Sequence, residues 1–262
     1  MSEEQAKITV HWLNGSRAQG ILFLLEQLNV PYEIKVYHRD PNNKAPRELA
    51  NVHPLGKSPV VTVTPPGGGE NIVLAETPFI VQYINDHFSN AFSSLEPKRW
   101  KEGQEGKVGG ETEEWLKYQY IMYYAEGSFM AQMVLYFLMD IIRGPKIPFF
   151  IRPMTRMVSN MVISAVPFPN LQKHFKMLEG YLEKNSYLCG DRLTNADIVM
   201  AFGMVSVKSV DMSQVGTWEK GSFAETYPNV WAYVGRIEQE PAWQKSVEKI
   251  KALEGDYEVL PK

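Results

Sequence analysis

The spacing of apolar residues changes once along this 262-residue sequence, and that change limits the folds open to it. Up to about residue 88, segments in which every second residue is apolar alternate with segments of helical spacing. From residue 111 onward the spacing is helical throughout. Period two is typical of strands and period 3.6 of helices. The sequence therefore predicts an α/β domain over residues 1–88, a linker and loop over 89–110, and an all-α domain over 111–262.

The first domain has room for four strands and three helices. We expect strands over residues 8–12, 32–37, 60–63 and 72–74, and helices over residues 17–28, 46–51 and 78–84. A Pro-Pro-Gly-Gly-Gly turn over residues 65–69 makes the last two strands a hairpin. This β-α-β-α-β-β-α order is thioredoxin-like. In the second domain we expect a long helix over residues 111–140 and a further helix over residues 170–184.

Composition excludes several classes of protein. An apolar content of 44% and a charged content of 22% are ordinary for a soluble protein with a core. The net charge of −3 carries no signature of nucleic-acid binding. The single cysteine rules out an internal disulfide, and residues 1–7 lack the apolar core of a secretory signal. No run approaches the ~18 apolar residues of a membrane span, so we expect a cytoplasmic protein. The histidines are scattered without metal-ligand spacing, so we expect no metal.

Two short motifs offer chemistry. Ser58-Pro59 precedes the strand over residues 60–63, where a proline must be a turn or edge residue, and a cis bond there would turn the Ser58 backbone outward. Glu76-Thr77 puts a carboxylate and a hydroxyl at the start of the helix over residues 78–84, where acidic residues are also favoured by the helix dipole alone. Together the motifs suit a small peptide, with backbone pairing for its main chain and a site for its amino-acid head group.

This pair of motifs resembles the glutathione site of the glutathione transferases. The pattern Gly-x-x-x-Thr-x-Ala-Asp-Ile, which begins at Gly190, has capping-box spacing between Thr194 and Asp197 and is similar to a capping element in the C-terminal domain of that family. Residues 10–13, 16–18, 33–40, 45–46 and 53–59 look like the fungal transferases of the microsomal-associated type. The resemblance implies a thioredoxin-like glutathione-binding domain, an all-α C-terminal domain, glutathione as co-substrate and a homodimer.

The resemblance implies that Ser16 activates the glutathione thiol. A free thiol, with a pKa near 8.5, is mostly protonated at neutral pH. Ser16 stands where the first helix begins, so its hydroxyl would donate to the sulfur while the helix N-terminus adds its dipole. A serine there is equally well explained as a helix cap. Asn14 is the rival donor, because some fungal relatives use an asparagine in this loop.

The resemblance also implies how the rest of glutathione is held. The Glu76-Thr77 pair would bind the γ-glutamyl group, and Ser58 would contact the cysteinyl portion through its backbone. Ser58 replaces the valine or isoleucine that is commoner in the family, and we expect its side chain to matter little. Lys57 would pair with the glycyl carboxylate, against two competitors, Arg39 and Lys44.

On this resemblance we expect a glutathione transferase that conjugates the glutathione thiolate to small electrophiles or acts on a peroxide. The long helix would line the electrophile site through Tyr120, Tyr123, Tyr124 and Gly127. Cys189 is predicted to be a small buried apolar residue, so we expect no thiol–disulfide chemistry from the protein itself. Two alternatives remain open: a weakly catalytic glutathione-dependent ligand carrier, and a regulatory relative that has lost the chemistry. The sequence does not identify the electrophile.

A basic segment follows the long helix. Residues 141–178 contain no acidic residue. Their basic residues are Arg143, Lys146, Arg152, Arg156, Lys173 and Lys176, and the apolar residues interleaved among them are Phe149, Phe150, Ile151, Met154, Met157, Val158 and Met161. We expect a helical excursion that packs on the body of the protein. The alternative is a basic amphipathic surface that contacts anionic lipid, which would be a peripheral membrane contact.

Overall fold

The computed structural model describes residues 6–90, 94–145, 147–210, 212 and 216–260. Residues 1–5 of the N-terminal segment and Lys146 of the basic segment therefore lie outside the described residues. The chain forms two compact units, and each unit is made of two or three separate stretches of the sequence. The thioredoxin-like unit comprises residues 1–96, 197–206 and 237–262, and the helical unit comprises residues 97–196 and 207–236. The predicted division at residues 88 and 110 stays a prediction.

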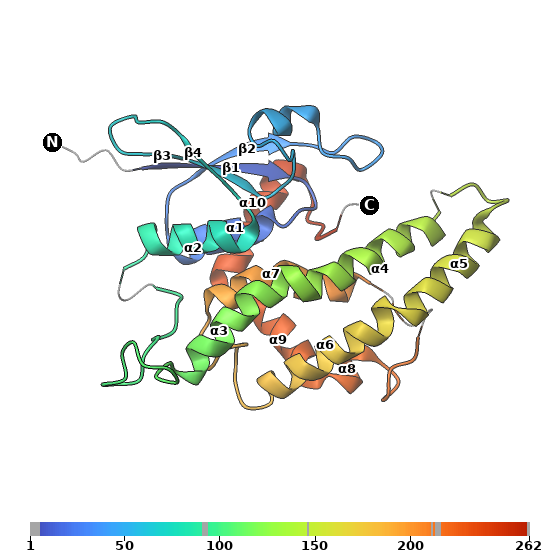
Figure 1. Ribbon diagram of the computed structural model, residues 1–262. Helices are drawn as coiled ribbons and strands as arrows, with labels where there is room; N and C mark the ends of the chain where they lie inside the picture. The colour runs from blue at the N-terminus through green and yellow to red at the C-terminus, as the bar shows by residue number, and fades with distance from the viewer. Residues whose placement is uncertain (1–5, 91–93, 146, 211, 213–215, 261–262) are drawn as a thin grey trace. The chain divides into compact units, whose positions relative to one another are not determined.

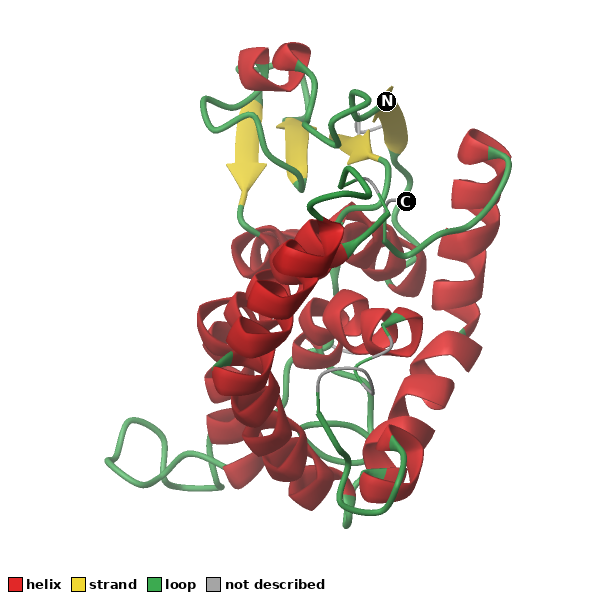
Figure 2. Cartoon of the chain, turned by 90° about the vertical axis from the view of Figure 1, so that its right-hand side faces the viewer, coloured by secondary structure: helices red, strands yellow, loops and turns green. Residues whose placement is uncertain are grey.

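The thioredoxin-like unit is built on a mixed four-stranded sheet (Figure 1). Its strands are β1 (Lys7–Leu13), β2 (Glu33–Tyr37), β3 (Val60–Thr64) and β4 (Ile72–Ala75), in the order β2-β1-β3-β4. β1 runs parallel to β2, and β3 is antiparallel to both of its neighbours. Each strand ends within one residue of its predicted bounds, because period-two alternation marks strand ends well. The described strands all lie in this unit (Figure 2).

Helix α1 (Ala18–Gln27) is buried on nearly every side. Residues 18–25 are all buried, which an isolated amphipathic helix would not show. α10 (Pro241–Glu254) packs against α1, with the Phe23 ring edge-on to Trp243 at a centroid distance of 5.5 Å. At Gly20 an added Cβ would lie 3.3 Å from the Ile198 carbonyl oxygen, so a larger residue would press on α7 (Asn195–Ser206). Segments from the end of the chain thus complete the core around the first helix.

The remaining elements of this unit cover the rest of the sheet. α2 (Thr77–Phe88) packs on α1 and β4. The predicted helix over residues 46–51 is a single 3₁₀ turn, η1 (Arg47–Asn51). It buries Leu49 against Leu13 and Tyr37, away from the α1 and α2 side of the sheet (Figure 1). This turn closes the loop that leads to the Ser58-Pro59 motif.

The helical unit begins with one long helix interrupted by a π turn. α3 (Glu113–Tyr124) passes into the π turn η2 (Ala125–Phe129) and then into α4 (Met130–Arg143). The Thr112 side chain caps the start by accepting a hydrogen bond from the Trp115 N–H at 3.2 Å, and Gly144 follows the end. The helix predicted over residues 111–140 is therefore confirmed to within three residues. The π turn was not foreseen, since it leaves no mark on apolar spacing.

Two of the other helices of the unit pack on α4. α5 (Arg152–Ala165) and α6 (Pro167–Leu182) both contact it, and α8 (Phe223–Thr226) and α9 (Pro228–Gln239) follow later in the chain. α6 corresponds to the helix predicted over residues 170–184. Glu179 of α6 holds the start of α9, accepting hydrogen bonds from the backbone N–H groups of Asn229 and Val230 at 3.0 and 2.9 Å. These bonds satisfy two of the N–H groups that a helix start leaves free.

The basic segment runs from the end of α4 through α5 into α6, and α4 and α5 form a helical hairpin. Ser159 and Ile163 of α5 are buried, so one face of the helix packs as expected. The seven apolar residues interleaved with the basic ones are nevertheless all exposed, from 37% for Ile151 to 79% for Phe149. The hairpin therefore carries an uncovered apolar surface in a single chain. We call it the hairpin face: Val134, Leu138, Ile141, Ile142, Phe149, Phe150, Ile151, Met154, Met157, Val158 and Met161.

We expected no run of ~18 apolar residues, and one helix is nevertheless long enough and apolar enough on average to be a candidate membrane span. The continuous helix Glu113–Arg143 has 31 residues, and its best window has a mean hydropathy of 1.3. Glu126 and scattered polar groups break the apolar run, which is why counting consecutive apolar residues missed it. Core helices of soluble proteins meet the same criterion, so this finding alone is weak evidence for a membrane span.

Two smaller expectations concern Cys189 and the capping element that begins at Gly190. Cys189 is 2% exposed, which confirms that it is buried. α7 begins at Asn195, directly after Thr194, as the capping-box spacing predicts, and both Thr194 and Asp197 are buried.

The described part of the linker is held by contacts at its C-terminal end. Trp100 pairs with Glu111, and the Arg99 guanidinium lies 4.5 Å from the ring centroids of both Trp100 and Trp115.

Candidate functional site

Three of the predicted site segments meet at one edge of the sheet. β1 and β4 are both antiparallel to β3, so the ends of β1 and β4 lie beside the start of β3. Ser16 follows the end of β1, Lys57 and Ser58 precede the start of β3, and Glu76 directly follows β4. Ala75 pairs with Val60, which fixes the register of the last two segments. Strand topology thus gathers residues that are up to 60 positions apart in sequence.

Ser16 lies buried at the start of α1. It is 6% exposed, and its Oγ accepts a hydrogen bond from the Ala18 N–H at 3.3 Å, while its carbonyl accepts one from the Gln19 N–H. Gly15 just before it has a φ of 55°, a left-handed conformation that suits glycine. The capping role and the chemical role are therefore compatible, because a hydroxyl that accepts one bond keeps its proton to donate.

Ser16 and Ser58 touch through their side chains. Their Oγ atoms are 3.0 Å apart, and either hydroxyl can be the donor. The Ser58–Pro59 peptide bond is cis, as the motif suggested. The sequence expectation assigned importance only to the Ser58 backbone. The hydroxyl contact was missed, and only the pairing of β1 with β3 together with a serine at this position would have pointed to it.

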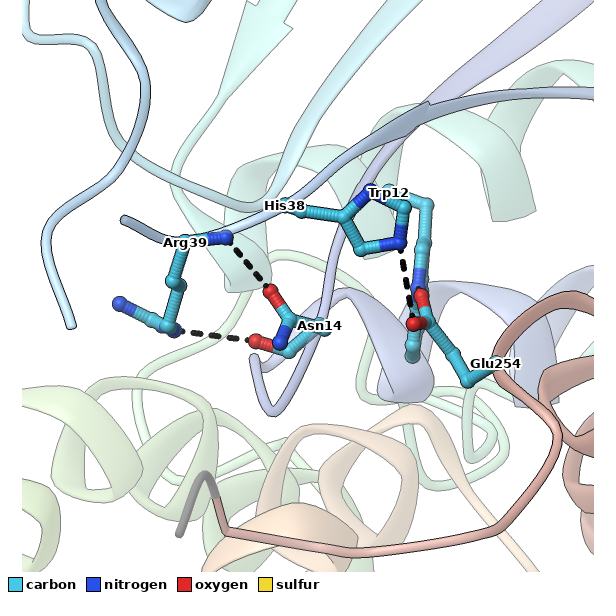
Figure 3. Close-up of polar contacts among 5 residues, drawn as sticks. All are labelled: Trp12, Asn14, His38, Arg39 and Glu254. Carbon is cyan, nitrogen blue, oxygen red and sulfur yellow. Dashed lines mark hydrogen bonds and ion pairs between the residues drawn. The ribbon is translucent and has the colours of Figure 1, made fainter. Parts of the chain in front are cut away.

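Asn14 and Arg39, just outside the Ser16 position, are joined by hydrogen bonds (Figure 3). The Asn14 Oδ1 accepts a hydrogen bond from the Arg39 backbone N–H at 2.9 Å. The Arg39 guanidinium in turn donates to the carbonyl oxygens of Asn14 at 3.0 Å, Gly15 at 3.3 Å and Asn43 at 3.0 Å. Half-burial lowers the pKa of Arg39. Arg39 therefore holds two loops in place, and its guanidinium is already engaged by three carbonyls.

The C-terminal helix supports the same loop. The Trp12 Nε1–H donates to the Glu254 Oε1 at 2.8 Å, and the Glu254 Oε2 lies 3.1 Å from the His38 Nε2 (Figure 3). Beyond α10, the Tyr257 hydroxyl lies 2.8 Å from the Gln19 Nε2 and 3.1 Å from the Gln19 Oε1, within hydrogen-bonding distance of both. Burial raises the pKa of Tyr257, so it stays neutral. Sequence reasoning missed these contacts, because they join residues more than 200 positions apart.

Glu76 has the least usual backbone at this edge. Its φ of 73° and ψ of 119° are outside the common regions for a residue with a side chain, a conformation that costs about 1–3 kcal/mol. Its carbonyl accepts the first hydrogen bond of α2, from the Ile80 N–H at 3.0 Å. Its carboxylate is exposed, whereas Thr77 beside it is 3% exposed. Strain of this kind concentrates at binding and catalytic sites.

Charged side chains without partners remain at the edge. Lys57 and Glu76 are both exposed, and within the described part of the chain neither side chain makes a hydrogen bond or an ion pair. Lys44 is also exposed, and its backbone N–H is bonded to the Asp40 carboxylate. One positive and one negative side chain at a single sheet edge fit a ligand that carries both charges. Among the described residues, no three His, Cys, Asp or Glu side chains come together in a way that would hold a metal ion.

The tyrosines expected to line the electrophile site differ in their surroundings. Tyr124 is buried and its hydroxyl lies 2.7 Å from the His174 Nδ1, and burial raises the pKa of Tyr124 and lowers that of His174. Tyr120 stacks on Tyr124 and is half-exposed, and Tyr123 is 77% exposed. Gly127 lies in the π turn, and an added Cβ there would meet no atom within 4 Å. Their part in substrate binding stays a prediction.

Comparison with protein-family models covers both units. The model "Glutathione S-transferase, N-terminal domain" matches residues 7–86, which include all four strands and the sheet edge. The model "Glutathione S-transferase, C-terminal domain" matches residues 163–241.

Individual relatives agree over nearly the whole chain. Glutathione S-transferase 1 of Saccharomyces cerevisiae is 31% identical over 251 residues, which are 95% of this chain and 98% of the relative. A glutathione S-transferase structure from Actinobacillus pleuropneumoniae is 27% identical with a TM-score of 0.63, over 92% of each chain. The glutathione transferase URE2P8 of Phanerochaete chrysosporium, solved with oxidized glutathione, is 18% identical with a TM-score of 0.66, over 97% of this chain and 99% of that one.

Proposed function

The chain belongs to the glutathione S-transferase family, and from that premise we propose that it joins the glutathione thiolate to small electrophilic molecules at the sheet edge that carries Ser16. The protein is a glutathione transferase and glutathione is its co-substrate. The observation that supports this site best is the meeting of Ser16, Ser58 and the Glu76-Thr77 pair where β1 and β4 end and β3 begins.

Each residue has a role that matches one part of the tripeptide. The Glu76 carboxylate pairs with the γ-glutamyl ammonium, and the Thr77 hydroxyl lies beside it. The Ser58 backbone pairs with the cysteinyl portion, and Lys57 pairs with the glycyl carboxylate. Support comes from the exposed, unpaired charges of Lys57 and Glu76. Arg39 is a weaker candidate for the glycyl carboxylate, because its guanidinium already donates to three carbonyls.

Ser16 stabilises the thiolate and does not act as a base. A thiol with a pKa near 8.5 must lose about one to two units to be largely ionised at neutral pH, and each unit is worth ~1.4 kcal/mol. One hydrogen bond to a charged sulfur and the N-terminus of α1 together supply that amount. Asn14 is less suited as the donor, since its Oδ1 is fixed on the Arg39 backbone.

Thiolate absorbance of the bound tripeptide against pH tests the assignment. In Ser16→Ala the pKa of bound glutathione should rise by about 1–2 units, and turnover at neutral pH should fall about 10- to 150-fold. The drop should shrink at high pH, where solvent produces thiolate unaided. Asn14→Ala is the matched control. If only Asn14→Ala moves the titration, the donor assignment is wrong, and if neither moves it, the side-chain mechanism fails.

The substrate is best approached by a panel. The same thiolate can attack an aryl halide or an isothiocyanate, or react with a hydroperoxide, so conjugation and peroxidase activity are separated by steady-state assay with each class. Binding of glutathione without turnover on any class would favour the ligand carrier or the regulatory relative instead.

We also propose that the protein is a homodimer in the cytoplasm and that the hairpin face is its contact surface. Eleven large apolar side chains are exposed on the hairpin, and large exposed apolar patches on soluble proteins commonly mark interaction sites. On α5 the exposed residues Met154, Met157, Val158 and Met161 follow the spacing i, i+3, i+4, i+7, which is that of a helix packing on another helix. A two-fold contact would set the same stripe against its copy.

The competing occupant of the hairpin face is anionic lipid. Phe149 and Phe150 are exposed near the turn of the hairpin, and Arg152 and Arg156 line a pocket beside it. Co-sedimentation with anionic vesicles that is lost as salt rises would favour the lipid contact, because salt screens that attraction. A salt-independent dimer with no sedimentation favours the second copy.

A further inference from the structure

We propose that the Ser58 side chain is a positioning residue for catalysis, because its hydroxyl donates to Ser16 and so directs the Ser16 proton to the glutathione sulfur. This inference rests on the proposed role of Ser16. It assigns to the Ser58 hydroxyl a role that its backbone contact with the tripeptide does not include. It also reverses our sequence expectation that the side chain matters little.

The hydrogen-bonding capacity of the Ser16 hydroxyl limits what it can offer a ligand. The Ser16 hydroxyl has one proton to donate and two lone pairs to accept. The Ala18 N–H occupies one lone pair at 3.3 Å, and this group can only donate. The Ser58 Oγ at 3.0 Å is the second partner. When Ser58 donates, both lone pairs of Ser16 are filled, and its proton is the one group left to offer to a ligand.

The direction of the Ser16–Ser58 bond depends on what else is bound. Two hydroxyls 3.0 Å apart can share their bond in either sense. A thiolate is a charged acceptor, and bonds to charged acceptors are stronger than bonds between neutral groups. The Ser16 proton therefore turns to the sulfur when glutathione binds, and the Ser58 proton turns to Ser16. The result is a chain of donors from Ser58 through Ser16 to sulfur, with no proton transferred.

Burial makes this chain effective. Ser16 is 6% exposed, so little water competes for its lone pairs. In such surroundings each bond in a chain polarises the next, by about 10–30% per bond. A valine or isoleucine at position 58 would leave one Ser16 lone pair empty and its hydroxyl freer to rotate. The expected effect is a lower pKa of bound glutathione in this protein than in the same protein without the Ser58 hydroxyl.

A matched pair of variants isolates the hydroxyl. Ser58→Thr and Ser58→Val have side chains of nearly equal shape and differ by hydroxyl against methyl. Any strain from the added branch is common to both. The pKa of bound glutathione is read from thiolate absorbance in each, and again with Ser16→Ala in the background. The KM for glutathione is measured alongside, since loss of a merely structural contact should change binding as well.

The expected result is a rise of about 0.5 pKa unit in Ser58→Val relative to Ser58→Thr, which is about a threefold loss of thiolate below the pKa. The KM for glutathione should agree between the two within about twofold. In the Ser16→Ala background the Thr–Val difference should vanish, because Ser58 then has no hydroxyl to act through.

Three other outcomes overturn the inference in distinguishable ways. If Ser16→Ala raises the pKa but the Thr and Val variants titrate alike, the Ser58 role is wrong and the proposed function stands. If the Thr–Val difference persists in Ser16→Ala, Ser58 acts on the sulfur directly. If Ser16→Ala leaves the titration unchanged, or if the wild-type protein does not bind glutathione, the Ser16 role fails and this inference fails with it.

Discussion

The sheet edge around Ser16 and the α4–α5 hairpin are stabilised in opposite ways. At the edge, polar groups make hydrogen bonds within the chain. The Arg39 guanidinium donates to three carbonyl oxygens, the Glu254 carboxylate accepts from Trp12, and the Ser58 and Ser16 hydroxyls bond to each other. On the hairpin, eleven large apolar side chains remain exposed, and only one face of α5 is buried. The loops at the edge are therefore held by contacts within the chain, whereas the apolar side chains of the hairpin face stay exposed in a single chain.

This contrast shows which properties a single chain can fix by itself. Hydrogen bonds are directional, so the edge needs one particular arrangement of its loops and holds it without help. Apolar contact is not directional and is driven by area removed from water, so a second copy or a lipid surface would both satisfy the hairpin face.

The largest effect is expected on the hairpin face. Met157→Glu would place a carboxylate in the proposed contact, and the two-fold symmetry would repeat it in the partner. An unpaired buried charge costs several kcal/mol, so the dissociation constant of the dimer should rise by at least about 100-fold. Analytical ultracentrifugation over a range of concentrations measures this change.

Met157→Leu is the control at the same position, because it keeps apolar character and volume and should leave the dimer intact. Activity per chain with glutathione at saturation should be retained in Met157→Glu if the edge is self-sufficient. A wild-type protein that sediments as a monomer at all concentrations would remove the dimer proposal and leave lipid as the occupant to test.

The next effect is on ligand binding at the edge. Glu76→Ala removes the counter-charge of the γ-glutamyl ammonium, and loss of a hydrogen bond to a charged group is worth roughly 1.5–3 kcal/mol. Affinity for glutathione should fall about 10- to 150-fold, as measured by calorimetry. Glu70→Ala is the matched control, since Glu70 is an exposed carboxylate in the turn at the other end of β4. Equal affinity in wild type and Glu76→Ala would remove the site assignment.

The sequence predicted the frame of the edge well and its side-chain contacts poorly. Strand bounds and α1 follow from apolar periodicity, and the meeting of Ser16 with Ser58 follows once β1 is paired with β3. Arg39 was expected to compete with Lys57 for the glycyl carboxylate of glutathione, but its guanidinium donates hydrogen bonds to three backbone carbonyls. Gly15 and Asn43, which supply two of those carbonyls, both have positive φ. Asparagine favours that conformation, but the sequence does not show which loop carbonyls then meet Arg39.

The hairpin was predictable in composition but not in exposure. Apolar residues at helical spacing are expected to face a core, and on α5 Ser159 and Ile163 do so. The stripe containing Met154, Met157 and Met161 has the same spacing and faces away. Apolar spacing predicts that a helix has an apolar side, but it does not show whether the surface that packs on that side belongs to the same chain. That information lies in packing, which sequence patterns do not contain.

The smallest effect concerns acid stability and compares the two units through one histidine in each, the buried His11 and the half-buried His174. His11 lies between the Tyr37 hydroxyl and Thr62, at 3.1 and 2.8 Å, and its pKa is lowered from 6.5 by burial and then by Lys35. Burial likewise lowers the pKa of His174 beside Tyr124.

As pH falls below about 6.5, the unfolded chain takes up a proton before the folded chain does, so the free energy of unfolding decreases. Stability is full above that pH and is lost below it. His11→Gln and His174→Gln should each flatten this dependence in urea unfolding followed from pH 8 to pH 5. The variant that flattens it more identifies the unit whose unfolding sets the transition, and equal slopes in wild type and both variants would show that neither histidine is held neutral by the fold.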